Sequence, residues 1–168
     1  MLRHFVPEFY FDAFDMASAE FLASIGVKGI VLDVDNTLEP YENPVPSEHV
    51  LAWFESLRCA GIKAAIVSNN NWERINTFNA DLKIPAYAKA GKPFSRNIIN
   101  ALRDMEIDKS EAIMMGDQVF TDVWAAHNAG IRAILVPPIN DKKDILTRFK
   151  RMLEIPVLKA YKRRVDKQ

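Results

Sequence analysis

Two aspartates separated by one residue, Asp33 and Asp35, follow an apolar run that begins at Ile30. The run is short and β-branched, which predicts a buried strand. Residues two apart on a strand face the same way, so the two carboxylates are expected side by side, where they repel each other. This pattern favours Mg²⁺-dependent phosphoryl transfer through an aspartyl phosphate; the alternative is an Asp-rich turn without chemistry.

Three later segments add polar side chains at comparable places. One follows an apolar run over residues 62–67, one precedes an expected helix start at residue 95, and one follows an apolar run over residues 113–115. The carboxyl ends of parallel strands share one edge of an open α/β sheet, where such sheets bind ligands. In chain order, the added side chains are Ser68, Asn69, Lys92, Asp117 and Asp122.

The complete order is Asp-x-Asp-x-Thr, then Ser, then Lys, then Gly-Asp-x-x-x-x-Asp. It resembles the four motifs of the haloacid dehalogenase (HAD) superfamily of phosphatases, over residues 29–136. Asn36 and the run Ser68-Asn69-Asn70 look like the capless subfamily IIIA and its YqeG-like branch. That branch is similar to the mitochondrial phosphatidylglycerophosphate phosphatases. The resemblance implies a Mg²⁺-dependent phosphomonoesterase for such a lipid or another bulky phosphate.

The resemblance also implies roles for the residues of the first two motifs. Asp33 would attack phosphorus, and Asp35 would protonate the leaving oxygen and then activate the hydrolytic water. Thr37 would hold the loop around the phosphate and orient Asp35. Ser68, together with Asn69, would hydrogen-bond a phosphoryl oxygen, although a hydroxyl after a strand is also an ordinary turn residue.

The remaining motifs imply the charge-stabilising part of the site. Lys92 would neutralise the charge that develops on phosphate and nucleophile; otherwise it is a solvated loop lysine. Mg²⁺ would be held by Asp33, Asp117 and the backbone carbonyl of Asp35, a donor set that this ion prefers. Asp122 would orient a metal-bound water or pair with Lys92, and its place near a helix start offers a purely structural alternative.

Helical periodicity, capping residues and short apolar runs predict alternating helices and strands. The expected helices span residues 15–25, 48–60, 72–82, 95–105, 121–129 and 142–153, and the later strands span 63–67, 87–88, 112–115 and 131–136. This alternation implies βαβ crossovers and therefore an α/β fold, a doubly wound parallel sheet of the HAD-like, Rossmannoid type.

We expect one domain, with an aromatic N-terminal segment (1–28), a catalytic core (29–140) and a basic C-terminal helix and tail (141–168). About 30 residues separate Thr37 from Ser68, too few for a cap domain of ~50 residues. The site is therefore expected to be open and to suit a bulky substrate, unless an oligomer supplies a cover.

Charge is distributed unevenly, although the formal net charge is zero. Residues 142–168 contain ten basic and three acidic side chains. They predict contact with an anionic membrane or nucleic acid, or alternatively a solvated amphipathic helix. The aromatic N-terminal segment either packs at the edge of the core or inserts Phe5, Phe9 and Phe11 into a membrane.

Several classes of protein are disfavoured. Cys59 is the single cysteine, so an intrachain disulfide is excluded, and no zinc-ligand spacing occurs. No apolar run is long enough to span a bilayer, and no secretory leader pattern begins the chain, so we expect a cytoplasmic protein, with peripheral attachment to the inner face of the membrane. Neither GxxxxGK nor GxGxxG occurs, so no nucleotide cofactor is expected.

Three functional interpretations remain. The first is a phosphatase that acts at a membrane surface, which the open site, the basic tail and the aromatic N-terminus favour. The second is the same chemistry on a soluble phosphate ester, a nucleotide or a nucleic-acid end. The third is a non-enzymatic phosphoacceptor or scaffold, which also uses clustered acidic residues with Thr and Lys.

Overall fold

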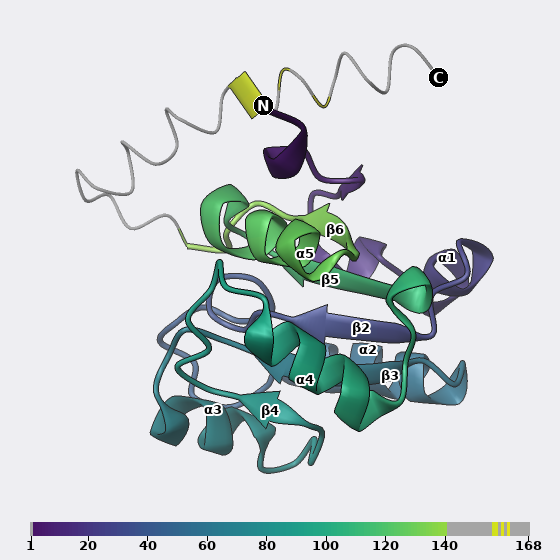
Figure 1. Ribbon diagram of the computed structural model, residues 1–168. Coiled ribbons are helices and arrows are strands. Elements are labelled where there is room, and N and C mark those ends of the chain that lie inside the picture. Colours follow the sequence, from purple (N-terminus) through teal and green to yellow (C-terminus); the bar gives the residue numbers. More distant parts are fainter. Residues whose placement is uncertain (1, 141–155, 158, 160, 162–168) are drawn as a thin grey trace.

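The computed structural model describes residues 2–140, 156–157, 159 and 161. Within them, strands form one sheet in the order β1-β6-β5-β2-β3-β4, and the neighbouring strands all run parallel. The strands are β1 (Phe9–Tyr10), β2 (Gly29–Leu32), β3 (Lys63–Val67), β4 (Ala86–Tyr87), β5 (Ala112–Gly116) and β6 (Arg132–Leu135). The parallel α/β sheet predicted from the sequence is confirmed (Figure 1).

Helices cover both faces of this sheet. The α-helices are α1 (Ala19–Ser24), α2 (Glu48–Cys59), α3 (Trp72–Asn79), α4 (Arg96–Met105) and α5 (Trp124–Ala129). In Figure 1, α4 and α5 lie on the near face and α2 on the far face. Side chains of β2 alternate between the two apolar clusters: Ile30 and Leu32 join α1, α2 and α3, whereas Val31 joins α4 and α5. Burial on both faces explains why β2 is a continuous apolar run.

Most predicted element boundaries agree with the structure, and the disagreements have local causes. The helix expected over residues 15–25 begins only at Ala19, because the Ser18 side chain accepts from the amide of Phe21 and caps α1 there. The helix expected over residues 72–82 ends at Asn79. The Asn79 side chain donates to the carbonyl of Ile84 at 2.8 Å and accepts from its amide at 3.2 Å, which holds the chain in a turn. The helix expected over residues 121–129 begins earlier, as a π-helical turn η4 (Val119–Val123) that continues into α5.

The N-terminal aromatic residues pack against the core. Phe9 and Phe11 each contact Phe21 edge to face, with ring centroids 5.2 and 5.1 Å apart, and Phe5 packs against Trp124 at 5.2 Å. The contacts agree with the first alternative, packing at the edge of the core, and the insertion of Phe5, Phe9 and Phe11 into a membrane stays a prediction. The same segment forms the edge strand β1, which is too short to show periodicity in the sequence.

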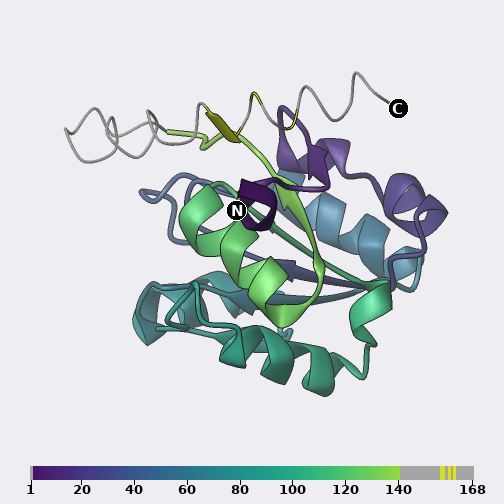
Figure 2. The same cartoon turned by 45° about the horizontal axis from the view of Figure 1, so that its top comes forward.

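The helix expected over residues 142–153 lies outside the described residues. Further along, Val157 is buried in the same apolar cluster as Val31, and the Tyr161 hydroxyl accepts a hydrogen bond from the Tyr10 amide at 3.1 Å. Figure 2 shows this part of the chain beside the N-terminal segment. Among the described residues, no helix has the length and apolar character required to cross a bilayer.

Candidate active site

The register of the sheet places the predicted residues at one edge. Leu32, the last residue of β2, is paired with Ile66 of β3 on one side and with Met115 of β5 on the other. The next residues along these three strands therefore meet where the arrow of β2 ends in Figure 1. The segment between β2 and α2 contains only turns and an isolated bridge, so no cap domain is inserted there.

A cavity of about 400 Å³ opens at this edge, and all of its lining residues are polar. They are Asp33, Asp35, Asn36, Ser68, Asn69, Asn70, Lys92, Gln118 and Thr121. Five of the predicted site residues are thus brought together around one cavity. The other three, Thr37, Asp117 and Asp122, are buried directly behind it, as their contacts with lining residues and with each other show.

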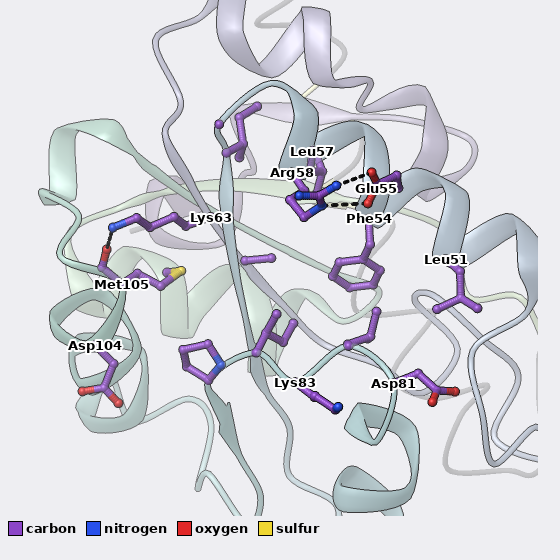
Figure 3. A pocket seen from close by; sticks show the side chains of 16 residues that line it. Leu51, Phe54, Glu55, Leu57, Arg58, Lys63, Asp81, Lys83, Asp104 and Met105 are labelled. Carbon is purple, nitrogen blue, oxygen red and sulfur yellow. Dashed lines mark hydrogen bonds and ion pairs between the residues drawn. The ribbon is translucent and has the colours of Figure 1, made fainter.

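A larger cavity, of about 850 Å³, lies elsewhere on the molecule (Figure 3). Its walls come from α2, the start of β3, the segment 81–85 and the end of α4. Figure 3 shows Arg58 paired with Glu55, and Lys63 donating to the carbonyl of Met105. None of the predicted site residues lines this cavity, so size alone does not identify the reactive pocket.

Lys92 joins two of the predicted carboxylates. Its Nζ donates to Oδ1 of Asp33 and to Oδ1 of Asp122, each at 2.7 Å, and all three side chains are buried. Burial acts to lower the pKa of Lys92, but the adjacent charges of Asp122 and Asp33 outweigh it and raise the pKa. The lysine is therefore a fixed positive charge next to Asp33.

Three carboxylates surround this single ammonium group. Oxygens of Asp33, Asp117 and Asp122 lie within 4.8 Å of one another. Burial, and then the charges of Asp122 and Asp33, raise the pKa of Asp117 to about 8. Burial also raises the pKa of Asp122 to about 6, against the opposing effect of Lys92. A divalent cation fits this donor set, because oxygen ligands with excess negative charge favour it.

A glycine allows the acidic cluster to be this compact. A Cβ atom on Gly116 would lie 2.3 Å from Cγ of Asp122, closer than atoms can approach. Asp122 reaches this place from the π-helical turn η4, where its Oδ2 accepts from the amide of Gln118 at 3.0 Å. Single π-helical turns of this kind often occur at functional sites. Glycine is therefore required immediately before Asp117, because any larger residue at position 116 would overlap the side chain of Asp122.

Asp35 is oriented by residues other than the predicted one. Its Oδ1 accepts from Nε of Arg74 at 3.0 Å, and its Oδ2 accepts from Nδ2 of Asn70 at 2.7 Å. The hydroxyl of Thr37, predicted to orient Asp35, instead donates to Oδ1 of Asp117 at 3.3 Å. Thr37 is almost fully buried and is not among the lining residues of the cavity, and its phosphate contact stays a prediction.

Arg74 is a residue that sequence reasoning missed. Besides its contact with Asp35, its Nη1 donates to the carbonyl of Pro44 at 2.8 Å, which connects α3 to the loop after β2. One signal in the sequence could have indicated it. Arg74 lies in the first turn of α3, where a positive side chain interacts unfavourably with the helix dipole. A residue that lowers the stability of its own helix is a candidate for a functional role.

The second motif positions its neighbours as well as lining the cavity. Asn69 accepts from the amide of Lys92 at 2.8 Å and donates to the carbonyl of Lys92 at 3.2 Å, so it fixes the backbone of the lysine. Ser68 accepts from the amide of Asn70 at 3.2 Å, which leaves the hydroxyl proton of Ser68 as a donor at the cavity wall.

Comparisons with known proteins agree with this geometry. A family model described as haloacid dehalogenase-like hydrolase matches residues 30–136. The chain is 37% identical over 162 residues to the probable phosphatase YqeG of Bacillus subtilis (strain 168), covering 96% of this chain and 94% of that protein.

Two more distant similarities concern a phosphatase sequence and a crystal structure of the same fold. Glyceraldehyde 3-phosphate phosphatase of Pyrococcus abyssi (strain GE5 / Orsay) is 26% identical over 113 residues, which cover 62% of this chain and 47% of that protein. The crystal structure of an uncharacterized protein from Listeria monocytogenes serotype 4b shares the fold, with a TM-score of 0.54 and 23% identity over 70% of this chain and 85% of the other. The chain therefore belongs to the family of haloacid dehalogenase-like hydrolases.

Proposed function

We propose that this chain, a phosphatase of the haloacid dehalogenase type, hydrolyses phosphate monoesters through an aspartyl phosphate formed on Asp33 with the help of Mg²⁺. The observation that carries the proposal is the position of Asp33 at the polar cavity, 2.7 Å from Nζ of Lys92 and within 4.8 Å of two further buried carboxylates. A carboxylate in this setting can reach a bound phosphoryl group, while the ammonium group of Lys92 and a bound cation would stabilise the transferred negative charge.

In the first half of the proposed reaction, an oxygen of Asp33 forms a bond to phosphorus as the ester oxygen leaves. Asp35 gives its proton to that leaving oxygen, so that an alcohol departs. In the second half, Asp35 takes a proton from a water molecule, and the resulting hydroxide attacks phosphorus. The bond between phosphorus and Asp33 breaks, and inorganic phosphate and the free carboxylate are restored.

The remaining residues bind and orient in this proposal. Ser68 donates to a phosphoryl oxygen, and Lys92 balances the charge of the transferred group while Asp122 holds it in place. Asp33, Asp117 and the backbone carbonyl of Asp35 would hold the metal. When bound, Mg²⁺ supplies positive charge to the phosphoryl oxygens. The carboxylate of Asp35 is not part of this proposed ligand set; its oxygens accept from Nε of Arg74 and Nδ2 of Asn70 and keep lone pairs for proton transfer.

The substrate class that we propose is a bulky phosphate ester, with a membrane lipid such as phosphatidylglycerophosphate as the first candidate. Three features support it: the absence of an inserted cap between β2 and α2, the small volume of the polar cavity, and the basic sequence of residues 142–168. They also support peripheral contact with an anionic membrane. The resemblance to subfamily IIIA and to phosphatidylglycerophosphate phosphatases points to the same class.

A soluble substrate is the second candidate. It is favoured by the partial similarity to a protein named as a glyceraldehyde 3-phosphate phosphatase. A three-carbon phosphate ester would occupy the polar cavity without using the surroundings of its mouth. Under this alternative, the roles of Asp33, Asp35 and Lys92 are unchanged.

The test is a panel of phosphate esters assayed with the purified full chain in the presence of Mg²⁺. The panel contains phosphatidylglycerophosphate in mixed vesicles, glyceraldehyde 3-phosphate, nucleotides and p-nitrophenyl phosphate, and Asp33→Asn serves as the inactive control. We expect many turnovers per chain and the highest kcat/KM for the lipid. A higher kcat/KM for glyceraldehyde 3-phosphate would support the soluble alternative. Release of no more than one phosphate per chain would refute the proposal that the protein hydrolyses phosphate esters catalytically.

A further inference from the structure

Large apolar side chains are exposed around the mouth of the catalytic cavity. Of the seven large apolar residues that are markedly exposed in the described part of the chain, four come from segments next to the cavity lining. They are Val45, Trp72, Phe94 and Ile139, and we call them the rim residues. Phe94 is 77% exposed, the highest value of the seven, and Trp72 is 50% exposed. A singly exposed apolar side chain is ordinary, but four of them in segments beside one cavity favour a surface that meets a partner.

Two rim residues are joined to the cavity by the chain itself. Trp72 stands two positions after Asn70, and Phe94 stands two positions after Lys92; both Asn70 and Lys92 line the cavity. The amide of Phe94 donates to the carbonyl of Gly91 at 3.0 Å, so the segment around Lys92 forms a tight turn that carries the exposed ring. Each ring is therefore only two residues along the chain from a side chain that lines the cavity.

The other two rim residues are joined to the cavity by hydrogen bonds. The amide of Ile139 donates to the carbonyl of Asn36 at 2.9 Å, and Asn36 is a lining residue. Val45 follows Pro44, whose carbonyl accepts from the same Arg74 that holds Asp35. The rim residues thus come from four separate segments, after β2, β3, β4 and β6. Each segment either contains a lining residue or is hydrogen-bonded to Asn36 or Arg74.

The polarity of the site changes abruptly between cavity and rim. All lining residues of the cavity are polar, which suits a phosphate group, whereas the rim offers exposed apolar side chains. A substrate whose phosphate lies against Asp33 must leave the cavity through this rim. The part of the substrate beyond the phosphate is therefore expected to be apolar.

We propose that the rim residues form a docking surface that enters the apolar–polar boundary of a lipid bilayer and receives the apolar body of a phosphate-bearing lipid. This inference rests on the proposed function, because it places the phosphate of that lipid at Asp33. A lipid surface is favoured over a protein partner because the polar lining of the cavity and the exposed apolar rim match the phosphate group and the apolar body of a lipid at a bilayer surface. A bilayer also delivers the substrate, and aromatic side chains on separate loops are typical of interfacial anchors.

The first experiment compares two substrates in the same variants. Trp72→Ser, Phe94→Ser and the double variant are assayed on phosphatidylglycerophosphate in phosphatidylcholine vesicles and on soluble glycerol phosphate. The ratio of kcat/KM for the lipid to kcat/KM for the soluble ester is expected to fall about tenfold or more in the double variant, since two aromatic rings that would be buried in the bilayer are lost. Met16→Ser is the matched control, because Met16 is 52% exposed and lies in the N-terminal segment, not next to a cavity-lining residue.

The second experiment detects docking without catalysis. The Asp33→Asn protein is mixed with vesicles that contain phosphatidic acid, and tryptophan emission is recorded. Of the other two tryptophans, Trp53 is only 6% exposed and Trp124 is half-buried against Phe5, so the blue shift expected on docking should come from Trp72 and disappear when Trp72→Phe is added. If the parent enzyme has no phosphatase activity, the proposed function fails, yet this fluorescence shift still decides whether the rim docks on lipid.

Three results would overturn the inference. One is an unchanged ratio of lipid to soluble activity in the double variant with an unchanged thermal midpoint. Another is an emission maximum that does not move when vesicles are added, or that moves equally in the Trp72→Phe protein. Loss of activity on both substrates by the same factor would also count against it, because that result assigns the rim residues to the integrity of the cavity.

Discussion

Nε of Arg74 lies 3.0 Å from Oδ1 of Asp35, and this contact joins helix α3 to the loop after β2. With Nδ2 of Asn70 donating to Oδ2 at 2.7 Å, both oxygens of the aspartate accept hydrogen bonds. Asp35 is thus held in one orientation at the cavity wall, which suits the proton transfer that we propose for it.

The first prediction concerns this contact. Arg74→Ala should lower kcat by about tenfold to a hundredfold on an alkyl phosphate and less on p-nitrophenyl phosphate, whose leaving group needs no proton. Steady-state rates for both esters provide the measurement. Arg103→Ala removes a highly exposed helical arginine and serves as the matched control. Equal losses on both esters in Arg74→Ala would show that Arg74 does not act through Asp35.

The second prediction concerns the nucleophile. Asp33→Asn should retain the fold and lose nearly all turnover, because the attacking carboxylate and a proposed metal ligand disappear together. No phosphoenzyme should be trapped by acid quenching. Asp35→Asn, in contrast, should still form the phosphoenzyme from p-nitrophenyl phosphate and release it slowly. Substantial turnover by Asp33→Asn would refute the aspartyl-phosphate mechanism.

The third prediction separates metal binding from proton transfer. Asp117→Ala should raise the Mg²⁺ concentration needed for half-maximal rate by about tenfold or more, since a carboxylate ligand is removed. Asp35→Asn should change this concentration little, because only its backbone carbonyl is proposed as a ligand. Rates measured across a Mg²⁺ titration distinguish the two variants. The same response in both would mean that the roles are wrongly divided.

The fourth prediction follows from the pKa of about 8 at Asp117. The folded-state pKa lies above the ordinary value of 3.8, so the metal-free protein favours the protonated group and should lose stability as pH rises from about 4 towards 8. Mg²⁺ binds the ionised group, so its apparent affinity should rise over the upper part of the same range. Thermal midpoints with and without Mg²⁺ should therefore differ more at pH 8 than at pH 6.

A matched variant tests the origin of this pH dependence. Asp117→Asn carries no titrating group at that position, so the metal-free midpoint should vary less between pH 6 and pH 8 than in the parent. Calorimetric titration in two buffers of different ionisation enthalpy should also detect proton release on Mg²⁺ binding to the parent. A parent protein that binds Mg²⁺ equally tightly at both pH values would contradict the assignment.

The sequence by itself determined the fold class and the neighbourhood of the acidic residues. Strand β2 is buried on both faces and therefore reads as a continuous apolar run, while α2 and α4 show clear helical periodicity. Once the strands are parallel, their carboxyl ends share one edge, so Asp33, Ser68 and Asp117 have to lie near one another. Local patterns suffice here because each depends on residues a few positions apart.

Only the tertiary structure decided which partners these residues have. Arg74 reaches Asp35 across 39 positions, and Thr37 turns to Asp117 instead, because both contacts depend on how α3 and β5 pack beside the loop after β2. The exposure of Trp72 and Phe94, and the burial of the N-terminal aromatic rings, depend in the same way on neighbours that periodicity does not encode. Side-chain contacts between distant segments are fixed by packing geometry, which exists only once the chain has folded.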